Sequence, residues 1–95
     1  MNHCIIAKFN DSVQDKPALM KEIKALFSSC DRPAEIEGIT IHENCIDRAN
    51  RYDIMIVIQL AREALPIWDE CSLHKRWKSE FGERLASKAI FDYED

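Results

Sequence analysis

The chain has 95 residues, 46% of them hydrophobic and 32% charged, and carries a formal net charge of −4. This length predicts a single domain over residues 1–95, and the composition is typical of a globular protein rather than a disordered one. The negative charge argues against a nucleic-acid partner, no apolar run approaches the roughly 20 residues of a membrane span, and no secretion leader is recognised, so we expect a cytoplasmic protein without a membrane partner.

The four cysteines, Cys4, Cys30, Cys45 and Cys71, are scattered along the chain and form no C-x-x-C pair. Without a secretion leader, this spacing favours reduced and mostly buried thiols over a disulfide framework. Zinc sites use closely spaced ligand pairs, and the three histidines are also far apart in the sequence. The sequence therefore predicts no metal and no cofactor.

The chain opens with a predicted strand over residues 3–9, followed by a helix that begins near Pro17. Proline suits the first turn because that position needs no backbone donor, and Asp15 or Ser12 is the predicted cap. Apolar side chains recur at helical spacing from Leu19 to Cys30. This pattern predicts a helix with one apolar stripe facing the core.

A turn over residues 28–33 follows, because Pro33 cannot continue the helix. Residues 35–43 form a second, more polar predicted strand, in which Gly38 indicates a bulge or a close backbone approach. Residues 44–51 are predicted to form a polar loop that leads into the next strand.

Residues 52–60, YDIMIVIQL, are predicted to form the central strand. They are mostly β-branched, no Gly or Pro interrupts them, and apolar side chains alternate onto both faces. One face carries Tyr52, Ile54, Ile56, Ile58 and Leu60, and the other carries Met55 and Val57. A strand that is apolar on both sides needs a covering layer on each side.

Two helices and a strand complete the predicted fold. A short helix over residues 62–70 is bent or restarted at Pro66, a second helix covers residues 73–85 with Ser72 as its cap, and the last strand covers residues 88–93. The order β-α-β-β-α-α-β is the ferredoxin-like pattern. The predicted fold class is α+β, with an antiparallel four-stranded sheet and helices on one face only.

The second face of this sheet needs a cover that the chain does not supply. Helices on one face leave in water about half of the apolar set Ile5, Phe9, Ile54, Ile56 and Ile58, and burying one isoleucine contributes about 1.5–3 kcal/mol. Such a patch is larger than monomers usually expose. We therefore predict a homodimer in which two sheets face each other as a dimeric α+β barrel, around a central space that is packed or hollow.

Several segments resemble, in the same order, the stress-responsive A/B barrel (Dabb) family of dimeric α+β barrel proteins. They are H-x-I-x-x-K-F at residues 3–9, E-N at 43–44, N-R-Y-D-I at 50–54, the helical His74, and I-F-D-Y at 90–93. The likeness spans nearly the whole chain. It implies a ferredoxin-like protomer and a homodimer with a central barrel, in agreement with the strand pattern.

One plant branch of this family resembles polyketide cyclases, in which a Tyr and a His face an internal cavity. The His matches His74, but the Tyr position holds Trp68, which cannot act as acid or base. Two further histidines of that branch fall on Cys71 and Ile54, and the proline usual after the first falls on Ser72. We therefore expect a homodimer of unestablished activity that binds a small apolar molecule in the barrel.

The alternative is a cofactor-free enzyme, cyclase-like or monooxygenase-like, that uses His74 as general base. A histidine with its usual pKa near 6.5 can act as a base near neutral pH, although His74 can equally cap its helix or complete a buried polar network. Asp92 marks a polar function if it points into the barrel and an ordinary edge charge if it points outward, and His42 is expected to be exposed. The candidate cavity residues are His3, Ile5, Ile54, Ile56, Trp68, Ile90 and Asp92, although core packing is the alternative for Trp68.

Overall fold

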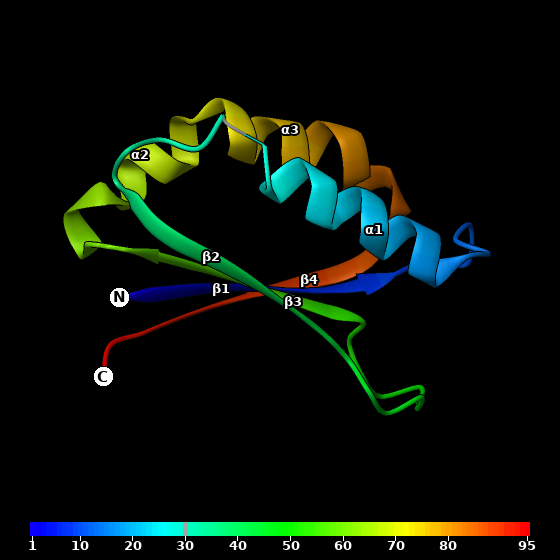
Figure 1. Cartoon of the computed structure of the whole chain (residues 1–95). Coiled ribbons are helices and arrows are strands. Elements are labelled where there is room, and N and C mark those ends of the chain that lie inside the picture. The colour runs from blue at the N-terminus through cyan, green and yellow to red at the C-terminus, as the bar shows by residue number, and fades with distance from the viewer. Residues whose placement is uncertain (30) are drawn as a thin grey trace.

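The computed structural model describes residues 1–29 and 31–95, and it has the predicted α+β architecture. One antiparallel sheet has the strand order β2-β3-β1-β4. Its strands are β1 (Asn2–Phe9), β2 (Ile36–Glu43), β3 (Ile54–Leu60) and β4 (Leu85–Tyr93). The helices lie together on one face of this sheet (Figure 1), and they are α1 (Lys16–Phe27), α2 (Leu65–Glu70) and α3 (Ser72–Phe81). The ferredoxin-like order β-α-β-β-α-α-β is thereby confirmed.

Helix α1 begins close to the predicted position. Asp15 is its cap, and the side chain accepts a hydrogen bond from the Ala18 backbone N–H at 3.1 Å. Pro17 lies in the first turn, where its missing N–H leaves no intrahelical bond unmade. Ser12, the other predicted cap, lies in the turn that follows β1. Cys30, the predicted end of the apolar stripe, lies outside the described residues.

Helix α3 differs from the prediction at both ends. Its cap is Cys71 rather than Ser72, because the Cys71 Sγ accepts from the His74 backbone N–H at 3.4 Å. It ends at Phe81, and a 3-10 turn (Gly82–Arg84) leads directly into β4, which therefore begins three residues earlier than predicted. Glycine is a weak helix former, so the α-helix ends at that point. The predicted restart at Pro66 is confirmed, since a separate 3-10 turn precedes α2.

Gly38 marks a bulge in β2, as the sequence indicates. Ile36 pairs with Leu60 and Gly38 pairs with Gln59, so two steps on β2 match one step on β3. A Cβ added at Gly38 would lie 2.5 Å from the Gln59 side-chain oxygen, so the absence of a side chain permits this close approach. β3 begins at Ile54 rather than at residue 52.

The core lies between the sheet and the helices, and it uses one set of alternating strand positions. Those positions include Ile5, Phe9, Ile54, Ile56 and Ile58, which pack in one buried cluster with Leu19, Ile23, Trp68, Leu73 and Trp77. The expectation that about half of the first five face water in a single chain is therefore wrong. Strand alternation places them all on the same side, and the helices of the same chain cover that side.

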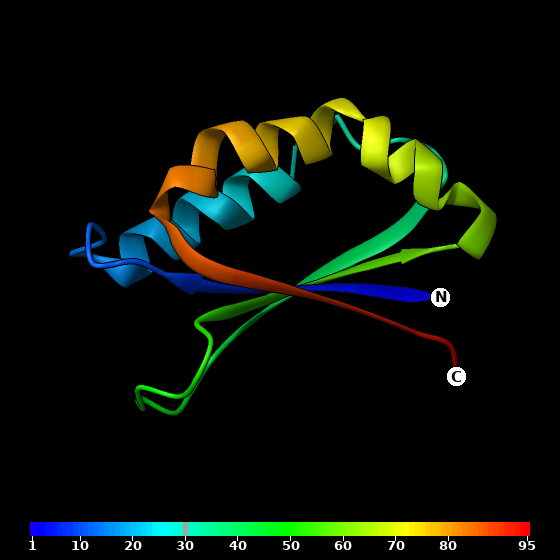
Figure 2. The ribbon, with the colours of Figure 1, turned by 180° about the vertical axis from the view of Figure 1, so that it is seen from behind.

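The opposite side, which we call the open face, carries the alternate positions of the same strands. They are Asn2, Cys4, Ile6 and Lys8 on β1, Thr40 and His42 on β2, Met55, Val57 and Gln59 on β3, and Ser87, Ala89, Phe91 and Tyr93 on β4. The described helices all lie on the other side of the sheet (Figure 2). Phe91 is 62% exposed, and His42 is exposed as predicted. The need for a second cover therefore remains, but for a different set of side chains.

Two segments leave the sheet on the side of the open face (Figures 1 and 2). One is the connection between β2 and β3, residues 44–53, which we call the arm. The other is the end of β4, at the opposite end of the sheet from the arm. None of the described helices is both long and apolar enough to cross a membrane.

Candidate functional site

His3 and Asp92 form a polar pair on the helix-facing side of the sheet. They are direct partners in the antiparallel register of β1 and β4, so both side chains point to the same side. His3 Nδ1 donates to an Asp92 carboxylate oxygen. His3 is buried, whereas Asp92 lies on the edge strand and is exposed. The carboxylate fixes the imidazole tautomer and leaves Nε2 free to accept a proton.

Trp68 on α2 fills the space between this pair and His74. Its ring centroid lies 6.4 Å from that of His3, 4.9 Å from that of His74 and 6.4 Å from that of Phe27. The Trp68 side chain is completely buried, and within the described residues nothing accepts its indole N–H. An aromatic side chain therefore packs the region where the resembling cyclases have a tyrosine.

His74 on α3 has a defined tautomer. Its Nδ1 lies 3.1 Å from the Asp69 carbonyl oxygen, and because a carbonyl only accepts, Nδ1 carries the proton and Nε2 is the basic nitrogen. Partial burial lowers the pKa of His74 below its usual value of about 6.5. The imidazole is therefore neutral at pH 7, which is the form that a general base requires.

The structure brings His3, His74, Asp92 and Trp68 to one region between the sheet and the helices. The candidate cavity residues Ile5, Ile54 and Ile56 are buried on the same side, and Ile90, the register partner of Ile5, is 50% exposed on the edge strand. The expectation that these residues line a space between two sheets is wrong about the face, because they lie on the side of the sheet that the helices of the same chain cover. Their contact with a ligand and the catalytic role of His74 stay predictions.

The cysteines differ more in exposure than predicted. Cys4 is buried on the open face, and burial, followed by the charge of Asp92, raises the pKa of its thiol. Cys45 is exposed on the arm, and Cys71 is half-buried at the start of α3. Of these three described thiols, only Cys4 fits the expectation of a buried cysteine.

The open face contains a hollow of about 260 Å³ next to the arm. Apolar side chains from β1 and β3 meet His42 there, and the lining is completed by the beginning and end of the arm. The residues are Ile6, His42, Glu43, Asn44, Arg51, Tyr52, Ile54 and Met55. Small-molecule pockets start at about 300 Å³, so one sheet face alone supplies a shallow part of such a site.

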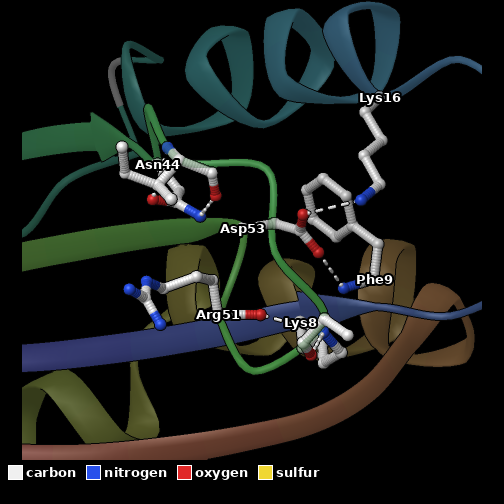
Figure 3. Close-up of polar contacts among 8 residues, drawn as sticks. Lys8, Phe9, Lys16, Asn44, Arg51 and Asp53 are labelled. Atoms are coloured by element: carbon white, nitrogen blue, oxygen red, sulfur yellow. Dashed lines mark hydrogen bonds and ion pairs between the residues drawn. The ribbon is translucent and has the colours of Figure 1, made fainter.

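Asp53 anchors the end of the arm to the core of the fold (Figure 3). Its carboxylate accepts from the Phe9 backbone N–H at 2.8 Å and from Lys16 Nζ at 2.9 Å. The hydrogen bond with Asp53 raises the pKa of Lys16. The Asp53 backbone N–H also donates to the Ala7 carbonyl at 2.9 Å. The arm therefore leaves the sheet from a fixed point.

Lys8 holds the middle of the arm from the open face. Its Nζ donates to the carbonyl oxygens of Ala49 at 2.9 Å and Arg51 at 2.8 Å (Figure 3). An ammonium has three donors, and these two bonds fix a segment that contains no helix or strand. A cavity of about 460 Å³ lies between the arm, Lys8 and the start of α1, and its cationic lining residues are Lys8, Lys16, Arg48 and Arg51.

Sequence reasoning assigned no role to this arm. Lys8, Asn44, Arg51 and Asp53 were part of the family resemblance, but only as motif letters. Nothing in the sequence showed that residues 44–53 meet Lys8 and Lys16. The available signal was the position of two lysines and an aspartate at strand and helix ends, which is too common to identify a network.

The fold and these sites define a class of protein, namely a ferredoxin-like α+β protomer with an uncovered sheet face. Similar solved structures include a dimeric ferredoxin-like protein of unknown function from Thermobifida fusca YX, with 16% identity, a TM-score of 0.82 and coverage of 97% of this chain and 87% of that one. Another is a dimeric protein of unknown function with a ferredoxin-like fold from Bacteroides fragilis NCTC 9343, with 18% identity, a TM-score of 0.81 and coverage of 99% and 94%.

A Dabb family protein with a ferredoxin-like fold from Mesorhizobium loti is also similar, with 11% identity, a TM-score of 0.68 and coverage of 99% of this chain and 94% of that one. The chain therefore has the fold of Dabb proteins, as the sequence resemblance predicted. No family model matches the sequence, and no curated protein does.

Proposed function

We propose that the chain forms a homodimer of the Dabb type, in which two open faces pack together and enclose a site for a small apolar molecule. The observation that supports this most directly is the exposure of Phe91 and Tyr93 on the open face, which also carries Ile6, Met55 and Val57. The similar structures from T. fusca and B. fragilis are dimeric proteins. Monomeric proteins rarely leave a large contiguous apolar patch in water.

The hollow beside the arm supports the ligand part of the proposal. Ile6, Met55 and Tyr52 give it an apolar lining, and His42 adds one polar group that can orient a ligand. A second copy supplies the missing roof and brings the enclosed volume into the range of small-molecule pockets. The binding site is therefore complete only in the dimer.

Sedimentation and binding of an apolar fluorescent probe, anilinonaphthalene sulfonate, test the two parts separately. Dimerisation at micromolar concentration supports the first part, and a chain that stays monomeric at high concentration contradicts it. Met55→Trp should fill the hollow and reduce probe binding without dissociating the dimer. The matched control is Ser79→Trp, which adds the same indole to an exposed position of α3. Equal probe binding by both variants contradicts the ligand site.

A cofactor-free enzyme with His74 as general base is the second proposal. The neutral imidazole of His74, with Nε2 as its basic nitrogen, supports this proposal. The Trp68 ring centroid lies 4.9 Å from that of His74, however, and leaves little room for a substrate beside the imidazole. Turnover of carbonyl or phenolic substrates should be lost in His74→Gln and retained in Lys75→Gln, which changes an exposed side chain on the same helix. Equal loss in both variants, or loss in neither, rejects the assignment.

A further inference from the structure

The cavity beside the arm is lined by more positive than negative side chains. Lys16 is paired with Asp53, so the cavity of the arm retains Lys8, Arg48 and Arg51 against the single carboxylate of Asp47. The two carbonyl oxygens that accept hydrogen bonds from Lys8 do not neutralise its charge. The arm itself carries two arginines and two aspartates, so the positive excess comes from Lys8 and Lys16, which lie beside it, in a chain whose formal net charge is −4. We call the arm together with these two lysines the cationic arm.

The cationic cavity and the hollow on the open face meet at the base of the arm. Asn44 and Arg51 line both of them. A partner that covers the open face therefore also reaches the cations of the arm. The hydrogen bonds of Lys8 and Asp53 hold the arm in place before any partner binds. Association therefore loses little free energy to ordering of the arm.

The opposite end of the sheet carries the complementary charge. Glu94 and Asp95 follow β4 directly and are exposed, and this end of β4 leaves the sheet on the same side as the arm (Figures 1 and 2). Glu94 forms an ion pair with Arg62 at 3.2 Å, and both side chains of that pair are more than half exposed. Such pairs contribute little in water and exchange readily for another cation.

Two copies that pack open face to open face about a two-fold axis have two simple arrangements. Either the arms of both copies meet each other, or each arm meets the end of β4 of the other copy. The first arrangement places two cationic segments together, which is unfavourable. The second places Arg48 and Arg51 of one copy near Glu94 and Asp95 of the other, and symmetry makes this contact twice.

We propose that the cationic arm binds the acidic end of β4 of a second copy, and that this contact fixes the orientation of the two sheets. The inference rests on the proposed homodimer and adds its geometry. It also assigns the polar network of Lys8 and Asp53 a role, which is to present the arm to the partner. The recognised group is a pair of carboxylates on an extended strand end.

The test measures the dimer dissociation constant by sedimentation at low salt. Arg51→Glu should weaken the dimer about tenfold, because it places a carboxylate against carboxylates at both symmetric contacts. The matched control is Arg32→Glu, the same charge change at an exposed position between α1 and β2, which should leave the constant unchanged. Adding Glu94→Arg and Asp95→Arg to Arg51→Glu should restore it. Salt should weaken the wild-type dimer more than the Arg51→Glu dimer.

Equal effects of Arg51→Glu and Arg32→Glu overturn the inference, because they show only a response to net charge. Weakening without restoration also overturns it, because the arm then binds something other than the end of β4. In both cases a wild-type dimer leaves the proposed function intact. A wild-type chain that never dimerises overturns the proposed function itself, and this inference with it.

Discussion

The two faces of the sheet are built from the same strands but end in different environments. The helix-facing side consists largely of isoleucines that are nearly inaccessible to solvent, packed on Trp68 and Trp77. The open face has buried Cys4 and Val57 at its centre and exposed Phe91 and Tyr93 toward one edge. The first face is covered by helices of the same chain, whereas the second exposes aromatic surface that folding of the single chain does not cover.

The same difference separates the two groups of polar residues. His3, His74 and Asp92 lie on the helix-facing side, where Trp68 fills the space between them. Lys8 lies on the open face, and with Asp53 it positions a segment that projects away from the core. Polar residues within a packed layer mainly stabilise the fold, whereas those at an uncovered surface are available to a partner. Four changes test this comparison.

The largest expected effect is on the helix-facing side. Trp68→Ala removes a completely buried indole and should lower the free energy of unfolding by about 3–5 kcal/mol, a large part of the total for a domain of this size. Ile67→Ala, at the preceding residue of α2 and 41% exposed, should change it by less than about 0.5 kcal/mol. Urea unfolding at one fixed protein concentration measures both. Similar losses would contradict the assignment of Trp68 to the core.

On the open face, the expected effect is on association. Phe91→Ala should weaken the dimer by about 2 kcal/mol, because truncating a large aromatic side chain in an interface typically has this cost. It should leave the far-ultraviolet circular dichroism spectrum unchanged, since the Phe91 side chain is 62% exposed in the single chain. Sedimentation at several concentrations measures the change. An unchanged dimer dissociation constant would show that Phe91 lies outside the interface.

The anchor of the arm should have an intermediate effect. Asp53→Ala leaves the Phe9 backbone N–H without its acceptor and should lower the free energy of unfolding by about 1–3 kcal/mol. Asp47→Ala removes an exposed carboxylate from the same arm and is the matched control. Urea unfolding compares the two variants, and equal stability would mean that the arm is not held by Asp53.

The smallest effect concerns pH. Because the pKa of His74 is lowered in the folded state, the unfolded chain takes up a proton first as pH falls below about 6.5. The contribution of neutral His74 to the free energy of unfolding is fully present above that pH. It declines as the pH falls toward the pKa of His74 in the folded state. His74→Gln should therefore lose less stability than the wild type between pH 7 and pH 5. Identical pH profiles of the two proteins from urea unfolding would show that folding does not lower the pKa of His74.

Much of the fold follows from local patterns in the sequence. Alternation of apolar residues located β1 and β3, Asp15 and Pro17 located the start of α1, and Gly38 located a bulge. The errors lie at boundaries where local signals compete. Ser72 is a better cap than Cys71 by intrinsic preference, but the tertiary position of the chain favours the cysteine. Gly82 ended α3 earlier than the spacing of its apolar residues indicated.

The amino-acid sequence by itself determined the elements, their order and the need to cover two faces of one sheet, because alternation and helical periodicity are local properties. It did not determine which face the helices cover, because alternation describes two faces without distinguishing them. Only the tertiary structure decided that Ile5, Ile54 and Ile56 belong to the core while Phe91 faces outward. It also decided that Lys8 and Asp53 hold one arm, because only folding brings Lys8 to Arg51, 43 positions away, and Phe9 to Asp53, 44 positions away.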